Sequence, residues 1–374
     1  MQRIVLGYSG GLKSSAAIAM LAEECRAEIV SVTLDLGQGR ALDDTRERAL
    51  ASGAVRAHVI DARHEFAQDF IVPALAAGAF HERRYALATA LSRPLIAKQL
   101  VSIAEIEGAR TVAHGCGTIL DSARIEAAAR ALDSDIRVLA PVCDSGLTRA
   151  ELMAYVQRRG TRPLGATGPL SSIDANLWAR STSAGAAVLA QPLPDLYVLT
   201  RSRSDVPETG ASVDLEFERG GPVSINGVAM PLVDLMTSLE TIAGAHGVGR
   251  FELTDRTRHA VEAQDLLEAP AAVVLHTAHA ALQQAVTPSD ERQHALDVGS
   301  EYADLISEGL WYTSRRNASD VLVKNIQEKV TGTVRLELVA GRCQVIGCRS
   351  AAARPTIFSR HSQPASPIVA AGRS

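Results

Sequence analysis

Short apolar runs of strand length alternate with longer segments of helical periodicity up to about residue 140. Five runs are rich in β-branched residues and end at turn residues, at positions 4–7, 28–34, 56–60, 110–113 and 136–139. Between them, apolar residues recur every three or four positions, as expected of helices over 12–21, 41–51, 65–77 and 86–105. This alternation predicts a mostly parallel sheet with helices on both faces.

The pattern changes near residue 165, where a turn-rich stretch begins. Beyond it, we expect strands typical of antiparallel pairing at 213–217, 223–225, 334–339 and 343–346, and helices over 232–243 and 297–308. The last residues are rich in Ala, Pro, Ser and Arg, a composition typical of weakly ordered tails. The sequence therefore predicts one domain over residues 1–165, a second over 166–350, and a tail over 351–374.

The composition of the 374-residue chain, 47% hydrophobic and 21% charged, is ordinary for a globular protein with a sizeable core. A formal net charge of −4 argues against a protein that mainly binds nucleic acid. We expect neither a secretory leader nor a membrane span, because no apolar stretch has the required pattern. The five scattered cysteines contain no CxxC pair, which favours a reducing cytoplasm. We expect small-molecule partners, no nucleic acid and no membrane.

The strongest local signal is the stretch Tyr8-Ser9-Gly10-Gly11-Leu12-Lys13-Ser14-Ser15, between the first strand and the first helix. Two glycines let the backbone turn sharply, and the N–H groups of a helix start attract an anion. The serines add hydroxyl donors and Lys13 adds a positive charge. This pattern favours a phosphate loop, although it lacks Walker spacing. The alternative is a glycine turn with serine caps.

This loop resembles the SGGxDS pyrophosphate loop of the ATP pyrophosphatase superfamily, and within it the YSGGLDTS form of the argininosuccinate synthase family. Other stretches resemble that family in the same order: LDLGQG at 34–39, RYALATALSRPLIAK at 84–98, AHGC at 113–116, SIDANLW at 172–178 and AGAHGVGR at 243–250. The resemblance implies an α/β fold. Its parallel-sheet nucleotide-binding domain is of the ATP pyrophosphatase (adenine nucleotide alpha hydrolase-like) type, and an α+β synthetase domain follows it.

The resemblance also implies an activity. Members of the family are AMP-forming, C–N-bond-forming ligases that use ATP and Mg2+ to join citrulline to aspartate. They adenylate the ureido oxygen, release pyrophosphate, and let the aspartate amine displace AMP. An adenylate is a good leaving group where a urea oxygen is not, and the protein holds the reactants in line and excludes water. The resemblance implies a cytoplasmic homotetramer or homodimer.

Site residues carry over by position. Ser9, Gly10, Gly11, Ser14 and Ser15 would hold phosphate, and Tyr8, Leu34, Arg93, His114 and Gly115 would line the nucleotide. Thr89 and Asp121 would face aspartate, while Tyr85, Arg124, Ser172, Ser181 and Asp255 would face citrulline. We assign catalytic roles to Lys13, Asp121 and Arg124, and no metal ligand to any side chain. Arg124 suits a carboxylate because a guanidinium offers two parallel donors.

Several positions depart from the family. Lys13 replaces its acid, Leu120 replaces the asparagine that contacts both amino acids, Asp255 replaces a glutamate, and Leu267 replaces a tyrosine. A leucine cannot make the lost hydrogen bonds. We therefore expect an ATP-dependent ligase whose acceptor or amine is altered. The alternatives are a true argininosuccinate synthase of arginine biosynthesis and a non-catalytic nucleotide-binding paralogue.

Two further features have simpler interpretations. Cys116 lies beside the expected site, but a catalytic thiol is the less favoured reading. His276 and His279 are spaced to share one helix face, but no third metal ligand is evident, which favours a packing role.

Overall fold

The computed structural model describes residues 2–39, 42–80, 87–160, 172–184, 196–255 and 263–351. Within these ranges, only the backbone is described at positions 42–43, 172, 183–184, 252–255, 263–265 and 290. The chain forms two compact units. Unit 1 comprises Met1–Phe66, Thr89–Pro169 and Leu305–Ser314, and unit 2 comprises Ala67–Ala88, Leu170–Asp304 and Arg315–Ser374. The boundary expected near residue 165 and the tail beyond Ala351 lie outside the described residues.

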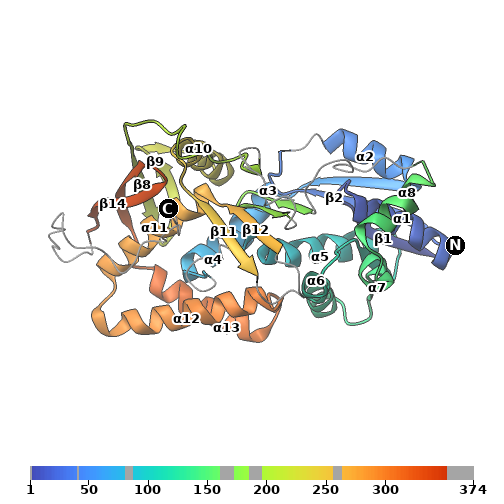
Figure 1. The fold of residues 1–374 in the computed structure, drawn as a ribbon. Helices are drawn as coiled ribbons and strands as arrows, with labels where there is room; N and C mark the ends of the chain where they lie inside the picture. Colours follow the sequence, from blue (N-terminus) through green and yellow to red (C-terminus); the bar gives the residue numbers. More distant parts are fainter. Residues whose placement is uncertain are drawn as a thin grey trace. The chain divides into compact units, whose positions relative to one another are not determined.

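A five-stranded parallel sheet forms the centre of unit 1 (Figure 1). Its strands are β1 (Arg3–Gly7), β2 (Glu28–Asp35), β3 (Arg56–Asp61), β4 (Thr111–His114) and β5 (Arg137–Leu139). They lie in the order β3-β2-β1-β4-β5, and every neighbouring pair is parallel. The predicted parallel sheet is therefore confirmed. Strand order reverses between β1 and β4, and such a switch point is where open parallel sheets bind ligands.

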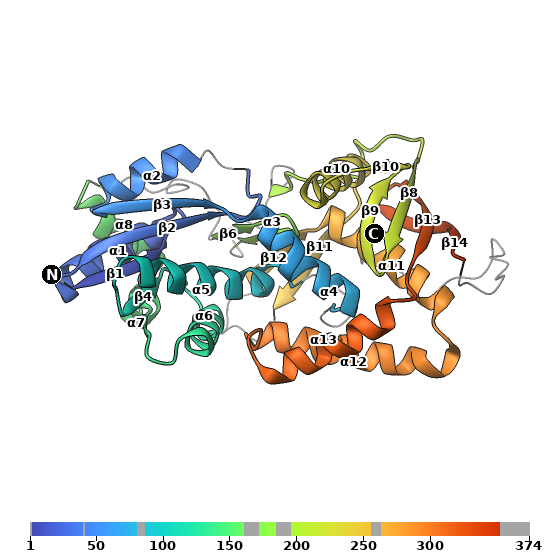
Figure 2. The same cartoon turned by 180° about the vertical axis from the view of Figure 1, so that it is seen from behind.

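Helices cover both faces of this sheet. They are α1 (Leu12–Cys25), α2 (Leu42–Ala51), α3 (Arg63–Phe66), α5 (Ala88–Ile106), α6 (Ile119–Leu132), α7 (Pro141–Ser145) and α8 (Arg149–Gln157). Ile4 and Leu6 share a buried cluster with residues of α1, whereas Gly7 faces Leu100 of α5. Because side chains alternate along a strand, α1 and α5 lie on opposite faces (Figures 1 and 2).

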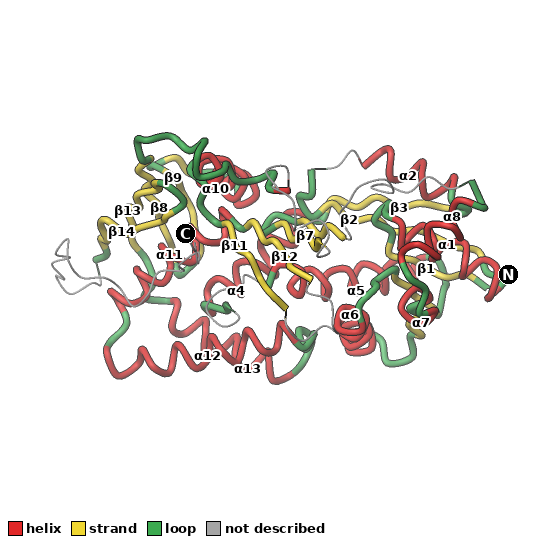
Figure 3. The backbone as a smooth tube through the Cα atoms, in the orientation of Figure 1, coloured by secondary structure: helices red, strands yellow, loops and turns green. Residues whose placement is uncertain are grey.

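Unit 2 contains two antiparallel sheets, drawn as yellow tubes in Figure 3. The larger has the order β10-β9-β8-β13-β14, formed by β8 (Ala211–Glu218), β9 (Gly221–Ile225), β10 (Val228–Ala229), β13 (Gly332–Val339) and β14 (Arg342–Arg349). It confirms the antiparallel strands expected from the sequence. The smaller has the order β11-β12-β7-β6, formed by β6 (Ser172–Ala175), β7 (Arg180–Ala184), β11 (Arg250–Asp255) and β12 (Ala263–Glu268). The sequence pattern did not predict this smaller sheet.

One helix expected from the sequence is interrupted in the structure. A continuous helix was expected over 65–77, but a π-helical turn, η1 (Ala67–Ile71), separates α3 from α4 (Val72–Ala77). Pro73 at the start of α4 has no amide hydrogen to donate, which favours a break in the helical hydrogen-bond pattern there. The other helices are α10 (Leu232–Ala245), α11 (Pro270–Val286), α12 (Ser289–Ser307) and α13 (Ser314–Gln327). In the described part of the chain, no helix has the length and apolarity of a membrane span.

Helix α11 is buried along most of its length and carries both histidines singled out above. The His276 ring lies 4.2 Å from the ring of Phe80 and 5.5 Å from that of Trp178, centroid to centroid. His279 Nε2 lies 2.8 Å from Gln327 Oε1. Burial lowers the pKa of His276 to about 3 and that of His279 to about 4, so both rings are neutral near pH 7.

Candidate active site

Two loops leave the carboxyl ends of β1 and β4 side by side, at the switch point of the unit 1 sheet. The strands pair in register, with Gly7 opposite His114. The loop after β1 runs into α1, and the loop after β4 runs into α6. Two helix N-termini therefore begin beside neighbouring strand ends, which is the usual placement for a phosphate-bearing ligand.

The first loop is held in shape by its own serines. Gly10 adopts a positive φ of 76°, which a glycine reaches without steric cost. The Ser9 amide lies 3.3 Å from Ser14 Oγ, which in turn donates to the Gly11 carbonyl over 3.2 Å. Gly11 is the N-cap of α1, and no described side chain caps this helix start. The first N–H groups of α1 are therefore available for an anion.

Three of the predicted ATP-binding residues are buried and support the protein scaffold. Tyr8 and Ser15 are 4% and 1% exposed, and their hydroxyl oxygens lie 3.2 Å apart. The Tyr8 carbonyl accepts a hydrogen bond from Thr33 Oγ1 over 2.9 Å. Leu34, at the end of β2, is also largely buried, and its carbonyl accepts from the Gln38 side chain over 2.6 Å. These contacts fix the carboxyl ends of the neighbouring strands β1 and β2.

Glycines in the second loop allow it to approach the first closely. A Cβ on Gly115 would lie 2.8 Å from Ser14 Cα and 2.9 Å from Ser14 N, so only glycine fits without a backbone shift. A Cβ on Gly117 would lie 2.6 Å from Lys13 Cε and 2.9 Å from its Cδ, and would also meet Nζ. The Lys13 side chain thus extends from the start of α1 to the second loop, where its ammonium group lies close to Gly117.

His114, at the end of β4, is 2% exposed and neutral near pH 7. Its burial and the nearby charge of Arg93 lower its pKa to about 4. Nδ1 accepts from the Cys116 amide over 3.3 Å, which leaves the ring proton on Nε2, 3.4 Å from Ser122 Oγ. The ring therefore ties the second loop to α6 and adds no charge.

Arg93, Asp121 and Arg124 form a compact charged group beside the second loop. Asp121 Oδ1 lies 3.3 Å from Arg93 Nε and 3.0 Å from Arg124 Nη1. Thr118 is the N-cap of α6, and its hydroxyl oxygen accepts a hydrogen bond from the Asp121 amide. The same hydroxyl donates to Asp121 Oδ2 over 3.1 Å. Burial alone would raise the pKa of Asp121, but the charges and hydrogen bonds of both arginines lower it to about 2. The carboxylate is therefore ionised and holds both guanidinium groups in place.

Sequence analysis missed two residues of this group. Arg124 Nε donates to the Ser307 carbonyl over 2.7 Å, and Gly309 lies against the Arg124 backbone. The local sequence around Ser307 gives no indication of a partner 183 residues earlier.

The remaining predicted residues are distributed over both units. Thr89 lies in the first turn of α5 in unit 1, and its carbonyl accepts from Ser92 Oγ over 2.8 Å. Ser181 is half-buried on β7 in unit 2, opposite Asp174 on β6 and Leu267 on β12. The backbones of Ser172 and Asp255 lie at the ends of β6 and β11, and Tyr85 lies outside the described residues.

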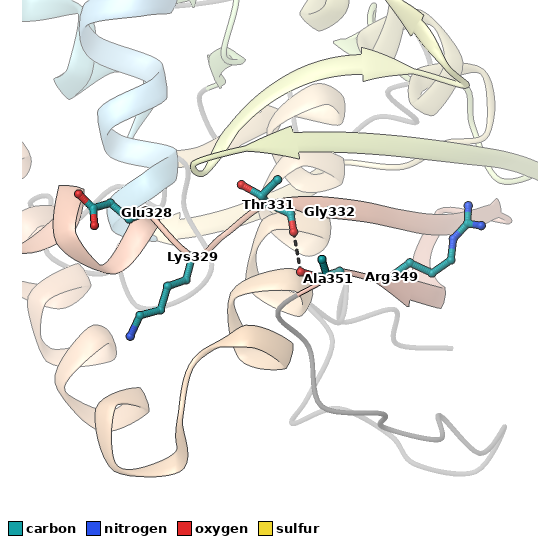
Figure 4. Close-up of a pocket in the computed structure, with 7 residues that line it drawn as sticks. Glu328, Lys329, Thr331, Gly332, Arg349 and Ala351 are labelled. Carbon is teal, nitrogen blue, oxygen red and sulfur yellow. Dashed lines mark hydrogen bonds between the residues drawn. The ribbon is translucent and has the colours of Figure 1, made fainter.

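Unit 2 also contains an open hollow that is unrelated to these residues (Figure 4). Among its lining residues, Ser350 Oγ donates to the Thr331 carbonyl over 2.6 Å. Lys329 and Arg349 line it but point in different directions, so they do not converge on one ligand. None of the site residues expected from the sequence lines this hollow, and it offers no second candidate site.

Comparison with known proteins identifies the family of this chain. Residues 3–162 match the model of the arginosuccinate synthase N-terminal HUP domain, and residues 171–360 match that of the arginosuccinate synthase C-terminal domain. Argininosuccinate synthase of Symbiobacterium thermophilum is 42% identical over 353 residues, covering 92% of this chain and 87% of the relative. That of Synechococcus elongatus is 40% identical over 351 residues, covering 92% and 88%. The chain therefore belongs to the argininosuccinate synthase family.

Proposed function

We propose that the chain is an ATP-dependent, AMP-forming ligase that joins citrulline to aspartate, as an argininosuccinate synthase does. The observation that carries the proposal is the close approach of two glycine-containing loops at the switch point, with Arg93, Asp121 and Arg124 beside them. An uncapped helix start and the Lys13 ammonium suit the triphosphate of ATP. The guanidinium groups suit the carboxylates of amino acids.

In this proposal the two loops bind ATP. The first amides of α1 and the hydroxyl of Ser9 would donate to phosphate oxygens, and Lys13 would neutralise charge as pyrophosphate leaves. No described set of three His, Cys, Asp or Glu side chains is grouped to hold a metal ion. Mg2+ would therefore be held chiefly by the phosphates of ATP, as Mg2+ commonly is at nucleotide sites.

The charged group beside the second loop would bind the amino acids. Arg124 would hold the carboxylate of citrulline, while Thr89 and Asp121 would face aspartate. Because Asp121 and the Ser307 carbonyl fix the guanidinium of Arg124, little side-chain freedom would remain to be lost on binding. The citrulline-facing roles that the family resemblance gives to Ser172, Ser181, Asp255 and Tyr85 stay predictions.

A ligase with an altered acceptor is a second candidate, favoured by the surface at the start of α6. Ile119 and Leu120 are 81% and 50% exposed there, directly before Asp121. Leu120 stands where the family has an asparagine that contacts both amino acids. A site with an apolar side chain at that position favours a substrate that makes fewer hydrogen bonds there.

Pyrophosphate release from Mg-ATP tests both candidates. The purified protein would be assayed with citrulline plus aspartate, with each omitted in turn, and with other ureido and amino compounds. Release that requires citrulline and aspartate together supports the first candidate. Release only with another pair supports the altered acceptor. ATP binding without release for any pair would overturn both candidates in favour of a non-catalytic nucleotide-binding paralogue.

A further inference from the structure

The segment Leu305–Ser314 belongs to unit 1, although the residues on either side of it belong to unit 2. It begins as the last turn of α12, which ends in two characteristic hydrogen bonds. The Gly309 amide donates to the Ile306 carbonyl over 3.1 Å, and the Leu310 amide donates to the Leu305 carbonyl over 2.8 Å. Together with the positive φ of 78° at Gly309, these bonds form a Schellman-type helix end. The segment is therefore locally well defined.

This helix end contacts Arg124 at two points. The Ser307 carbonyl accepts from Arg124 Nε over 2.7 Å, which fixes the plane of the guanidinium group. A Cβ on Gly309 would lie 2.7 Å from Arg124 Cα and 3.1 Å from its Cβ and Cγ. These atoms form the backbone and root of the arginine and cannot swing away as a flexible side-chain end would. Gly309 is thus required by the closeness of Arg124 as well as by its own backbone angle.

The same segment also reaches the helix that carries Arg93. The Tyr312 hydroxyl donates to the Pro94 carbonyl over 3.1 Å, one residue from Arg93 in the sequence. Arg93 and Arg124 both bind Asp121. One short segment from late in the sequence therefore contacts Arg124 directly and the backbone next to Arg93, while the carboxylate between the two arginines accepts a hydrogen bond from Thr118.

We propose that Leu305–Ser314 is a positioning segment that sets Arg124 for its amino-acid substrate, with Gly309 as its critical residue. The inference rests on the proposed function, since it assumes that Arg124 binds an amino-acid carboxylate. Ser307 acts through its backbone carbonyl and Gly309 through its lack of a side chain, so neither contacts the substrate itself. Displacing a substrate-binding group by up to about 1 Å sharply lowers its contribution to substrate binding and catalysis.

Gly309→Ala tests the proposal, with Gly160→Ala as its matched control. Gly160 also follows a helix of unit 1, has a φ of +69° and donates its amide to the residue three positions earlier. A Cβ there meets nothing within 4 Å. Both variants carry similar backbone strain, but only Gly309→Ala displaces Arg124. We expect both variants to lose melting temperature, with the larger loss in Gly309→Ala because of this contact, and a rise in the citrulline KM of about tenfold or more for Gly309→Ala alone.

Two further measurements separate positioning from general damage. The Kd for ATP, measured by calorimetry, should stay within about twofold of the wild-type value in both variants, because the first loop is untouched. Tyr312→Phe removes only the hydroxyl donor, so it tests the same segment if Gly309→Ala does not fold. We expect it to raise the citrulline KM about threefold, the loss of one neutral hydrogen bond.

Each result has a distinct meaning. If the wild-type protein shows no citrulline-dependent turnover and binds no citrulline, the proposed function fails and this inference fails with it. If the wild-type protein is active but Gly309→Ala and Gly160→Ala change the citrulline KM equally, the positioning role is wrong and the proposed function stands. An unchanged citrulline KM in Tyr312→Phe, when Gly309→Ala does not fold, also contradicts the positioning role.

Discussion

Asp121→Asn removes the only negative charge that the structure places between Arg93 and Arg124 in the described part of the site. The pKa of Asp121 falls from 3.8 to about 2 in the folded protein, and its side chain is 18% exposed. Such a lowering of the pKa corresponds to about 2–3 kcal/mol of stability at neutral pH. The asparagine leaves the two arginine charges uncompensated. We therefore expect a loss of about 2 kcal/mol or more at pH 7.

The pH dependence has a defined sign. Because the folded-state pKa is lower than the unfolded one, the ionised Asp121 stabilises the protein fully above about pH 4. This contribution declines as the pH falls from about 4 toward 2. The difference in stability between the wild-type protein and Asp121→Asn should therefore be constant near neutrality and shrink through that acid range.

Urea unfolding followed by tryptophan fluorescence can isolate unit 1. The chain has two tryptophans, of which Trp311 lies in unit 1 and Trp178 in unit 2. In a Trp178→Phe background, the emission of the buried Trp311 reports on unit 1. Glu126→Gln is the control, since Glu126 lies on the same helix and pairs with Arg130 at the surface. It should cost about 0.5 kcal/mol or less. Equal losses for Asp121→Asn and Glu126→Gln would refute the reasoning.

Three other substitutions test separate parts of the account. Gly115→Ala should raise the Kd for ATP, measured by calorimetry, at least tenfold, because the added Cβ would meet the Ser14 backbone at 2.8 Å. An unchanged Kd would show that ATP binding does not need this close approach of the two loops. Lys13→Met keeps the stem but removes the charge, and should weaken ATP binding about tenfold, since a hydrogen bond to a charged group contributes about 1.5–3 kcal/mol. Tighter ATP binding would instead mean that Lys13 impairs the site. Glu107→Gln should lower the free energy of unfolding in urea by about 1–3 kcal/mol, because this buried carboxylate binds Arg3, Arg56 and His58. A loss no larger than that of the exposed-pair control Glu126→Gln would contradict this stabilising role.

The first half of the fold could be predicted because its signals are local. Apolar runs such as 28–34 have strand length, and glycines mark the turn into α1, so strand, loop and helix are each encoded within a few residues. The small sheet of unit 2 was missed because its two central strands lack such signals. β7 reads RSTSA and β12 reads AQDLLE, without the regular alternation of apolar and polar residues that predicts a strand.

The phosphate loop was visible in the sequence, but the partners of its neighbours were not. Asp121 and Arg124 lie three residues apart on one helix, so their ion pair follows from helical spacing. The contact of Arg124 with Ser307 spans 183 residues and depends on the whole fold of unit 1. The buried position of Tyr8 also depends on packing, because its ring joins the cluster formed by β1 and α1. Residue type alone indicates neither contact.

The proposed use of ATP to activate the ureido oxygen of citrulline is tested most directly by following the transfer of that oxygen. The purified protein would be incubated with Mg-ATP, aspartate and citrulline labelled with oxygen-18 at the ureido position, and the products analysed by mass spectrometry. Activation by adenylation moves the labelled oxygen into AMP as the aspartate amine displaces it. The account predicts one oxygen-18 atom in each AMP formed, together with argininosuccinate. Unlabelled AMP, or a labelled product without any AMP, would contradict it.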